Sequence, residues 1–161
     1  MELDIEYEFT LIAISSVASD VQIAYSLNKY LSANFQREEE DLDVYYKDKE
    51  EPIFFPLYLH EEKHYMENWY LIKNKITSDK KFVADESTKE PNLFFESGIG
   101  TQSTTYFLPE KKEANFILRL DYIENKSRID SIIKSIKSIP HITTAYSINY
   151  DTLRSKKNLI F

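Results

Sequence analysis

Apolar residues recur along the chain with two different periods, and the change of period marks the expected elements. From Tyr7 to Ile14 apolar residues occupy both phases of an extended chain, which predicts a central strand covered on at least one face. Ser16 to Asp20 then offers turn and N-cap side chains, so a helix is expected to follow and to end at Asn34. The apolar stripe of this helix is Ile23, Ala24, Leu27, Tyr30 and Leu31.

The middle of the chain has the alternation that is typical of strands. A second strand with one buried face is expected at Leu42, Val44 and Tyr46. The segments Ile53 to Leu59 and Tyr65 to Asn74 predict two aromatic-rich strands of a β-hairpin. The less regular stretch from Thr77 to Gly100 predicts short strands in a long excursion, and Tyr106 to Leu108 should be extended before Pro109.

The last third of the chain predicts strand, helix and strand in turn. Alternation at Phe116, Leu118, Leu120 and Tyr122 marks the first strand. Asn125 or Ser127 should cap a helix that Pro140 ends. Its apolar face is Ile129, Ile132, Ile133 and Ile136, and the returning strand carries Ile142, Thr144, Tyr146 and Ile148. The mainly apolar residues 158–161 are expected to dock onto the body of the protein.

Strand–helix–strand units at both ends, with antiparallel strands between them, predict the fold class. We expect an α+β protein with an antiparallel sheet, two helices on one face, ferredoxin-like βαβ units at both ends and an inserted β-hairpin region. A length of 161 residues fits a single domain, residues 1–161, around one core.

Composition narrows the class of protein further. Hydrophobic residues make up 42% of the chain and charged residues 29%, which is enough apolar material for a core. The chain has no Cys, so disulfides, thiolate nucleophiles and cysteine-based zinc sites are excluded. Its 2 Gly argue against glycine-rich phosphate loops. Residues Met1 to Glu6 lack the pattern of a signal peptide, and no apolar run predicts a membrane span, so we expect a cytoplasmic protein.

Charge makes general nucleic-acid binding an alternative rather than the main hypothesis. The formal net charge is -7, and an acidic protein repels phosphate backbones unless basic residues segregate into a patch. The candidate patch is Arg154, Lys156 and Lys157, with Lys111-Lys112 as a neighbour. Contact with RNA through these residues is therefore kept as one alternative function.

His60-Glu61-Glu62-Lys63-His64 matches the H-E-x-x-H pattern of zinc metalloproteases. That chemistry needs both imidazoles on one face of a helix, with the glutamate polarising a metal-bound water. Here the flanking segments predict strands, so we expect the motif in the hairpin connection with both rings at a solvent-facing tip. A metal-dependent hydrolase using His60, Glu61 and His64 remains the enzymatic alternative.

No other sequence pattern indicates a catalytic or cofactor-binding residue. The chain has no Gly-x-Ser-x-Gly elbow, and none of its 27 acidic residues has an apolar setting that marks it as a general acid. Trp69 and its neighbouring tyrosines are expected to pack in the core or across strands. The leading hypothesis is therefore a non-enzymatic binding module for a protein partner or small ligand, with a homo-oligomer as another partner class.

The segment Leu108-Pro109-Glu110-Lys111-Lys112-Glu113-Ala114-Asn115-Phe116 resembles the one for which the IPExxxVDY family is named. Residues 9–31, 69–75 and 144–161 are similar to that family as well, so the likeness spans most of the chain. The resemblance implies a small protein of the Bacteroidetes group whose genes often lie near those for ribonuclease III and pyruvate kinase. It therefore implies a cytoplasmic housekeeping or regulatory role, and it carries over no catalytic residue.

Departures from the family pattern favour an architectural role for this segment. Only Pro109 and Glu110 match the defining letters, and Asn115 stands where the pattern has an aspartate. A proline turn that leads into a buried strand tolerates such changes, whereas a catalytic aspartate does not. The motif positions Leu108, Pro109, Glu110 and Phe116 are accordingly expected to be structural.

Overall fold

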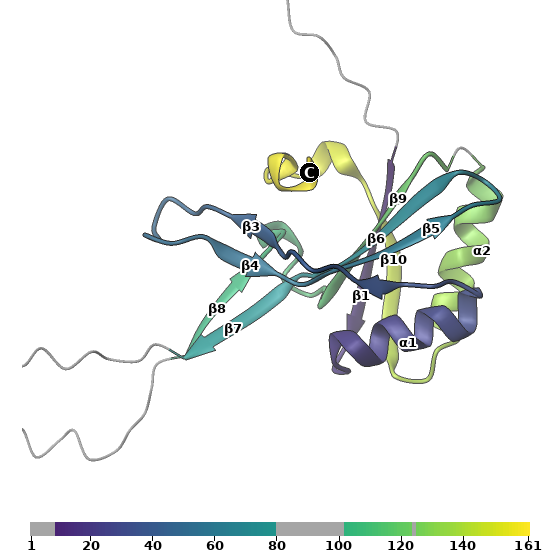
Figure 1. Ribbon diagram of the computed structural model, residues 1–161, viewed down its shortest axis with the longest axis horizontal. Helices are drawn as coiled ribbons and strands as arrows, with labels where there is room; N and C mark the ends of the chain where they lie inside the picture. The colour runs from purple at the N-terminus through teal and green to yellow at the C-terminus, as the bar shows by residue number, and fades with distance from the viewer. Residues whose placement is uncertain (1–8, 80–101, 124) are drawn as a thin grey trace, which may run out of the picture.

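A six-stranded antiparallel sheet with two helices forms the body of the protein (Figure 1). The computed structural model describes residues 9–79, 102–123 and 125–161. The spatial order of the strands is β10-β1-β9-β6-β5-β2. The elements of this body are β1 (Phe9–Ser16), α1 (Asp20–Leu31), β2 (Gln36–Arg37), β5 (Leu57–Glu62), β6 (Glu67–Lys73), β9 (Phe116–Asp121), α2 (Lys126–Lys137) and β10 (Ile142–Ile148). The predicted α+β class is confirmed, and the ferredoxin-like detail stays a prediction.

Two short ribbons and three 3-10 turns complete the described structure. The strands β3 (Leu42–Val44) and β4 (Ile53–Phe55) form one ribbon, and β7 (Lys75–Asp79) and β8 (Gln102–Tyr106) form the other. The turns are η1 (Pro109–Lys111), η2 (Tyr150–Thr152) and η3 (Lys156–Leu159). The expected short strands therefore begin at β7, whereas most of the predicted excursion, residues 80–101, lies outside the described residues.

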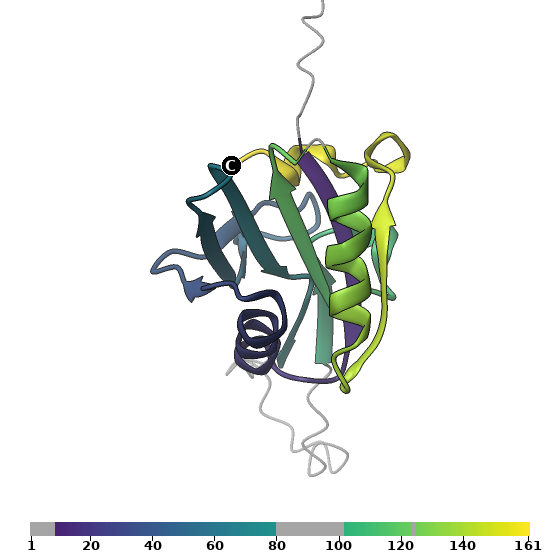
Figure 2. The ribbon, with the colours of Figure 1, turned by 90° about the vertical axis from the view of Figure 1, so that its right-hand side faces the viewer.

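Both helices cover the same face of the sheet, which Figure 2 presents toward the viewer. Ser19 caps α1 in a reciprocal capping box with Gln22, and Asn125 caps α2, as one of the two residues predicted to do so. Helix α1 ends earlier than expected because Ser32 takes a left-handed conformation with φ 53°. Tyr30 was expected in the apolar stripe, but 39% of it is exposed, so it lies at the rim.

The opposite face of the sheet is covered without any helix. The β3–β4 ribbon, the loop around η1 and the C-terminal turns pack there, through Val44, Phe107, Leu153 and Leu159 among others. Strand β1 is buried on both faces, with Ile12 and Ile14 under the helices and Leu11 and Ala13 on the other side. The prediction of a covered central strand is confirmed. In the described part of the chain, no helix is long and apolar enough to cross a membrane.

Candidate functional site

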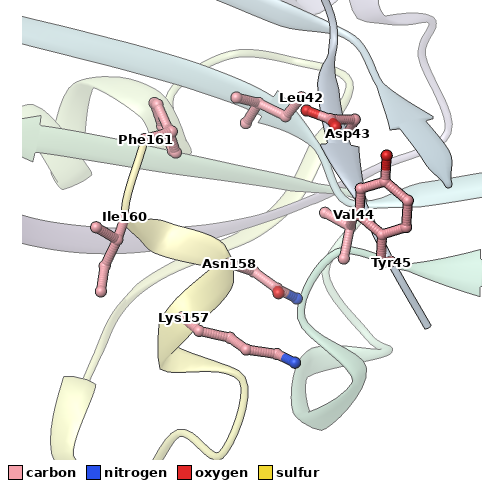
Figure 3. A pocket seen from close by; sticks show the side chains of 8 residues that line it. All are labelled: Leu42, Asp43, Val44, Tyr45, Lys157, Asn158, Ile160 and Phe161. Atoms are coloured by element: carbon pink, nitrogen blue, oxygen red, sulfur yellow. The ribbon is translucent and has the colours of Figure 1, made fainter. Parts of the chain in front are cut away.

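A cavity of about 300 Å³ lies between strand β3 and the end of the chain (Figure 3). We call it the β3 groove, and we call residues 154–161 the C-terminal segment. The lining residues are Leu42, Asp43, Val44, Tyr45, Lys157, Asn158, Ile160 and Phe161. Two walls therefore define the groove, one a β-strand and the other the C-terminal segment.

The strand wall offers main-chain groups as well as side chains. Strand β3 pairs with β4 through Leu42↔Phe55, Asp43↔Phe54 and Val44↔Ile53, and in the described structure it has no second partner strand. Figure 1 shows β3 between β4 and the C-terminal segment. Alternate backbone N–H and C=O groups of β3 therefore point away from β4, as in any edge strand.

Arg119 of β9 holds the other wall in place. Its Nη1 donates a hydrogen bond of 2.6 Å to the carbonyl oxygen of Leu159, while Nε and Nη2 donate to Asp121 at 2.7 and 2.9 Å. Its guanidinium carbon lies 4.7 Å from the ring centre of Phe9, 5.3 Å from that of Tyr70 and 4.6 Å from that of Phe161. This planar cation, packed among three aromatic rings, docks the C-terminal segment on the sheet.

Glu110 fixes the start of the C-terminal segment. Its Oε1 accepts hydrogen bonds from the backbone N–H of Arg154 and, at 2.5 Å, from that of Ser155. Burial raises the pKa of Glu110, but these backbone hydrogen bonds to the carboxylate outweigh it, so its pKa is lowered. Asn158 adds a hydrogen bond of 2.8 Å from Nδ2 to the carbonyl oxygen of Phe107. The loop around η1 thus carries the C-terminal wall of the groove.

Asn74 in turn organises the loop around η1. This residue is 0% exposed. Its Nδ2 donates to the carbonyl oxygens of Lys111 and Ala114 at 2.9 and 2.8 Å, and its Oδ1 accepts from the N–H of Leu108 at 2.7 Å. One buried side chain therefore satisfies three backbone groups of a segment with no regular ladder of its own.

The motif positions occupy this loop and the strand that follows it. Leu108 is fully buried and extended, Pro109 opens η1, Glu110 binds the C-terminal segment and Phe116 begins β9 in the helix-side core. The expected structural role of these positions stays a prediction. Sequence reasoning missed Asn74 and Arg119. Of the two, only Arg119 could have been noticed in the sequence, because it is a charged residue inside the alternating strand of residues 116–121.

Exposed apolar side chains line part of the groove. Tyr45 is 68% exposed, Ile160 54% and Phe161 47%, and all three line the cavity. The charged side chains in the lining are Asp43 and Lys157, which carry opposite formal charges, although the chain as a whole carries -7. Clustered exposed apolar side chains beside a strand edge are typical of an interaction site.

The histidines of the H-E-x-x-H pattern do not converge. The predicted hairpin is confirmed as β5 and β6, with its turn at residues 63–66, and His64 is exposed there. The expectation that His60 also lies at the tip is wrong, because strand pairing continues to Glu62 opposite Glu67. His60 is only 7% exposed and packs 5.1 Å from Trp69, ring centre to ring centre, in the helix-side core.

A hydrogen bond from the backbone selects one tautomer of the neutral His60 ring. The backbone N–H of Asn34 donates to His60 Nδ1 at 3.1 Å, so the neutral ring carries its proton on Nε2. A metal ligand at Nε2 would need that proton on Nδ1, where it would face the amide N–H of Asn34. In the described residues, no group of three His, Asp or Glu side chains could hold a metal ion. The arrangement therefore disfavours metal chemistry at this motif.

The two basic clusters of the sequence are neighbours in the structure, since Glu110 beside Lys111 contacts Arg154. Three lysine ammonium groups in this area lie over tyrosine rings. The pairs are Lys111 with Tyr146 at 5.6 Å, Lys112 with Tyr106 at 5.9 Å and Lys156 with Tyr150 at 4.8 Å. Cations on aromatic rings are compatible with an RNA surface, but they equally stabilise the packing of this loop.

No protein-family model matches the chain, and comparisons with curated proteins and with solved structures give no match either. The resemblance to the IPExxxVDY family therefore stays a prediction from the residues quoted for it.

Proposed function

We propose that this chain is a non-enzymatic binding module that holds an extended segment of a protein partner in the β3 groove. The observation that carries the proposal is the unpaired edge of β3 beside the exposed side chains of Tyr45, Ile160 and Phe161. A peptide strand added to such an edge gains main-chain hydrogen bonds, and its alternate side chains enter the adjacent hollow.

The size of the groove favours a peptide over a larger organic ligand. A cavity of about 300 Å³ is at the lower end of ordinary ligand pockets, which hold about 300–1,000 Å³. It suits one or two apolar side chains of an extended segment. Because Asp43 and Lys157 carry opposite formal charges, the anchoring side chains should be uncharged. The absence of Cys from the whole sequence supports a cytoplasmic partner.

The direct test is selection from a random peptide library displayed on phage, with the wild-type chain as bait. Enriched peptides should alternate apolar and polar residues. A synthetic copy of an enriched peptide should bind at least about tenfold more weakly to Ile160→Asp, because the bound peptide would remove water from the new aspartate carboxylate. Tyr25→Asp is the matched control, since Tyr25 is 69% exposed on α1 and lies outside the groove.

Failure to enrich peptides, or equal affinity of both variants, would overturn the proposal. Circular dichroism on each variant separates loss of binding from loss of folding.

The two alternatives predict different binding behaviour. A metal-dependent hydrolase predicts tight zinc binding by the metal-free chain that is lost in His64→Ala, whereas the hydrogen bond of Asn34 to His60 argues for no tight binding. An RNA-associated protein that uses Arg154, Lys156 and Lys157 predicts binding that weakens steeply with salt. Both experiments use the same purified chain as the peptide selection.

A further inference from the structure

The outer edge of strand β10 is the longest unpaired strand edge of the six-stranded sheet. Among the residues that the structure describes, strand β10 (Ile142–Ile148) pairs with β1 on one side only, whereas the opposite edge of the sheet is β2, which has two residues. Figure 2 shows β10 beyond α2, so the helix does not cover this edge. Alternate N–H and C=O groups along β10 therefore face outward.

The sequence of β10 carries neither charge nor proline to hinder pairing, although Glu113 and Lys111 from the loop around η1 contact Tyr146. From Ser138 to Tyr150 the sequence has no Asp, Glu, Lys or Arg, although 29% of the chain is charged. The strand itself contains no proline, and Thr143, Thr144 and Ser147 expose small polar side chains. Edge strands that remain single usually carry lysine, proline or an inward charge. An uncharged, β-branched edge instead favours pairing with another strand.

We propose that a second copy of this chain pairs with it, antiparallel, along β10. The regular part of β10 is Thr144 to Ile148, beyond the register shift opposite Ser15 and Ser16 of β1. A two-fold axis at Tyr146 places each Thr144 opposite an Ile148 and each Ala145 opposite a Ser147. The two tyrosines then meet at the axis, and both sheets join into one continuous sheet.

The side chains of this register are complementary on both faces. Thr144, Tyr146 and Ile148 share the face that has no helices, because their partners in β1 include Leu11 and Ala13 of that core. Aromatic and β-branched pairs are the favourable cross-strand contacts. Ala145 and Ser147 lie on the helix face, where their small side chains leave room for the two α2 helices to approach.

The net charge of the chain determines the salt concentration at which association should be measured. Each copy carries a formal charge of -7, so two copies repel at low salt, and the repulsion is screened as salt rises. Sedimentation of the full chain over a concentration series should show species of twice the 19.1 kDa monomer, with association stronger at physiological salt than at low salt.

Two kinds of variant test the interface itself. Thr144→Lys with Ser147→Lys adds charge to exposed edge positions and should weaken association by about tenfold or more. The control is Thr77→Lys with Ser78→Lys, which adds the same charge on exposed positions of β7 and should leave association unchanged apart from the weaker repulsion. Since the chain has no Cys, Tyr146→Cys should form a cross-linked dimer under mild oxidation, and Thr77→Cys should not.

A chain that stays monomeric at all concentrations overturns the proposal, as does a dimer that tolerates both edge lysines. Cross-linking of Thr77→Cys as fast as Tyr146→Cys overturns the register. Peptide binding in the β3 groove uses another face, so the edge variants should retain it, and failure of one proposal leaves the other standing.

Discussion

Asn74 offers a sharp test of how the groove is built, through the change Asn74→Asp. The substitution keeps the shape of the side chain but replaces the Nδ2 amide by an oxygen. That atom donates to the carbonyl oxygens of Lys111 and Ala114 in a residue that is 0% exposed. The variant therefore loses two hydrogen bonds and places an acceptor against two acceptors.

The expected cost follows from these contacts. A buried polar group left without its partner costs about 1–3 kcal/mol, and two carbonyl groups are affected, so we expect a loss of about 4 kcal/mol in the free energy of unfolding. For a chain of this size such a loss lowers the melting temperature by about 8–16 °C. Denaturant titration measures the free energy, and thermal unfolding followed by circular dichroism measures the shift.

The pH dependence of Asn74→Asp distinguishes a buried carboxylate from general damage. Burial should raise the pKa of the new aspartate in the folded state above its unfolded value. The protonated acid can again donate one hydrogen bond, so the deficit relative to wild type should be largest at neutral pH and shrink as pH falls. Asn34→Asp, at an exposed position, is the control and should change stability by about 0.5 kcal/mol or less. A deficit below about 1 kcal/mol for Asn74→Asp, or one independent of pH, would refute the assigned role.

Further substitutions test individual contacts and one strained backbone position. Glu110→Gln should lower the free energy of unfolding at pH values above the ordinary glutamate pKa of 4.5, because the pKa of Glu110 is lowered in the folded state. This loss relative to wild type should vanish as pH falls through that lowered folded-state pKa, and denaturant titration from pH 7 to 3 measures it. Arg119→Lys should speed amide exchange in residues 156–161, because lysine cannot replace the bidentate and stacked contacts; unchanged exchange would contradict this. His60→Ala should cost about 2–4 kcal/mol and His64→Ala about 0.5 or less in denaturant titration, and equal costs would argue against the core position of His60. Met66→Gly should raise the melting temperature slightly, since Met66 has φ 56° and is 86% exposed; a lower one would contradict that strain.

The regular elements were predictable because their signals are local. The alternation at Phe116, Leu118 and Leu120 and the helical spacing in residues 129–136 correspond to β9 and α2 as the structure has them. Tyr122 was expected in the same strand, but it follows the end of β9 with φ 65° and is 60% exposed. Capping residues at Ser19 and Asn125 are likewise short-range features. Such patterns depend on one stretch of chain, and long-range contacts do not alter them.

The groove could not be predicted, because every contact that builds it is long-range. Asn74 is bonded to residues near position 110, and Glu110 to the backbone at residues 154–155. Nothing in the spacing of these residues marks them as partners. His60 shows the same limit: the hairpin was correct, but whether its side chain faces the core depended on how far β5 pairs with β6.

Amide hydrogen exchange of β3 tests the proposed function most directly. If an extended peptide adds to the open edge of this strand, the outward amides among residues 42–45 should exchange more slowly when a library-selected peptide is bound. The amides through which β3 and β4 face each other in the ribbon are already paired and should change much less. Tight peptide binding that leaves exchange in β3 unchanged would show that the peptide binds elsewhere.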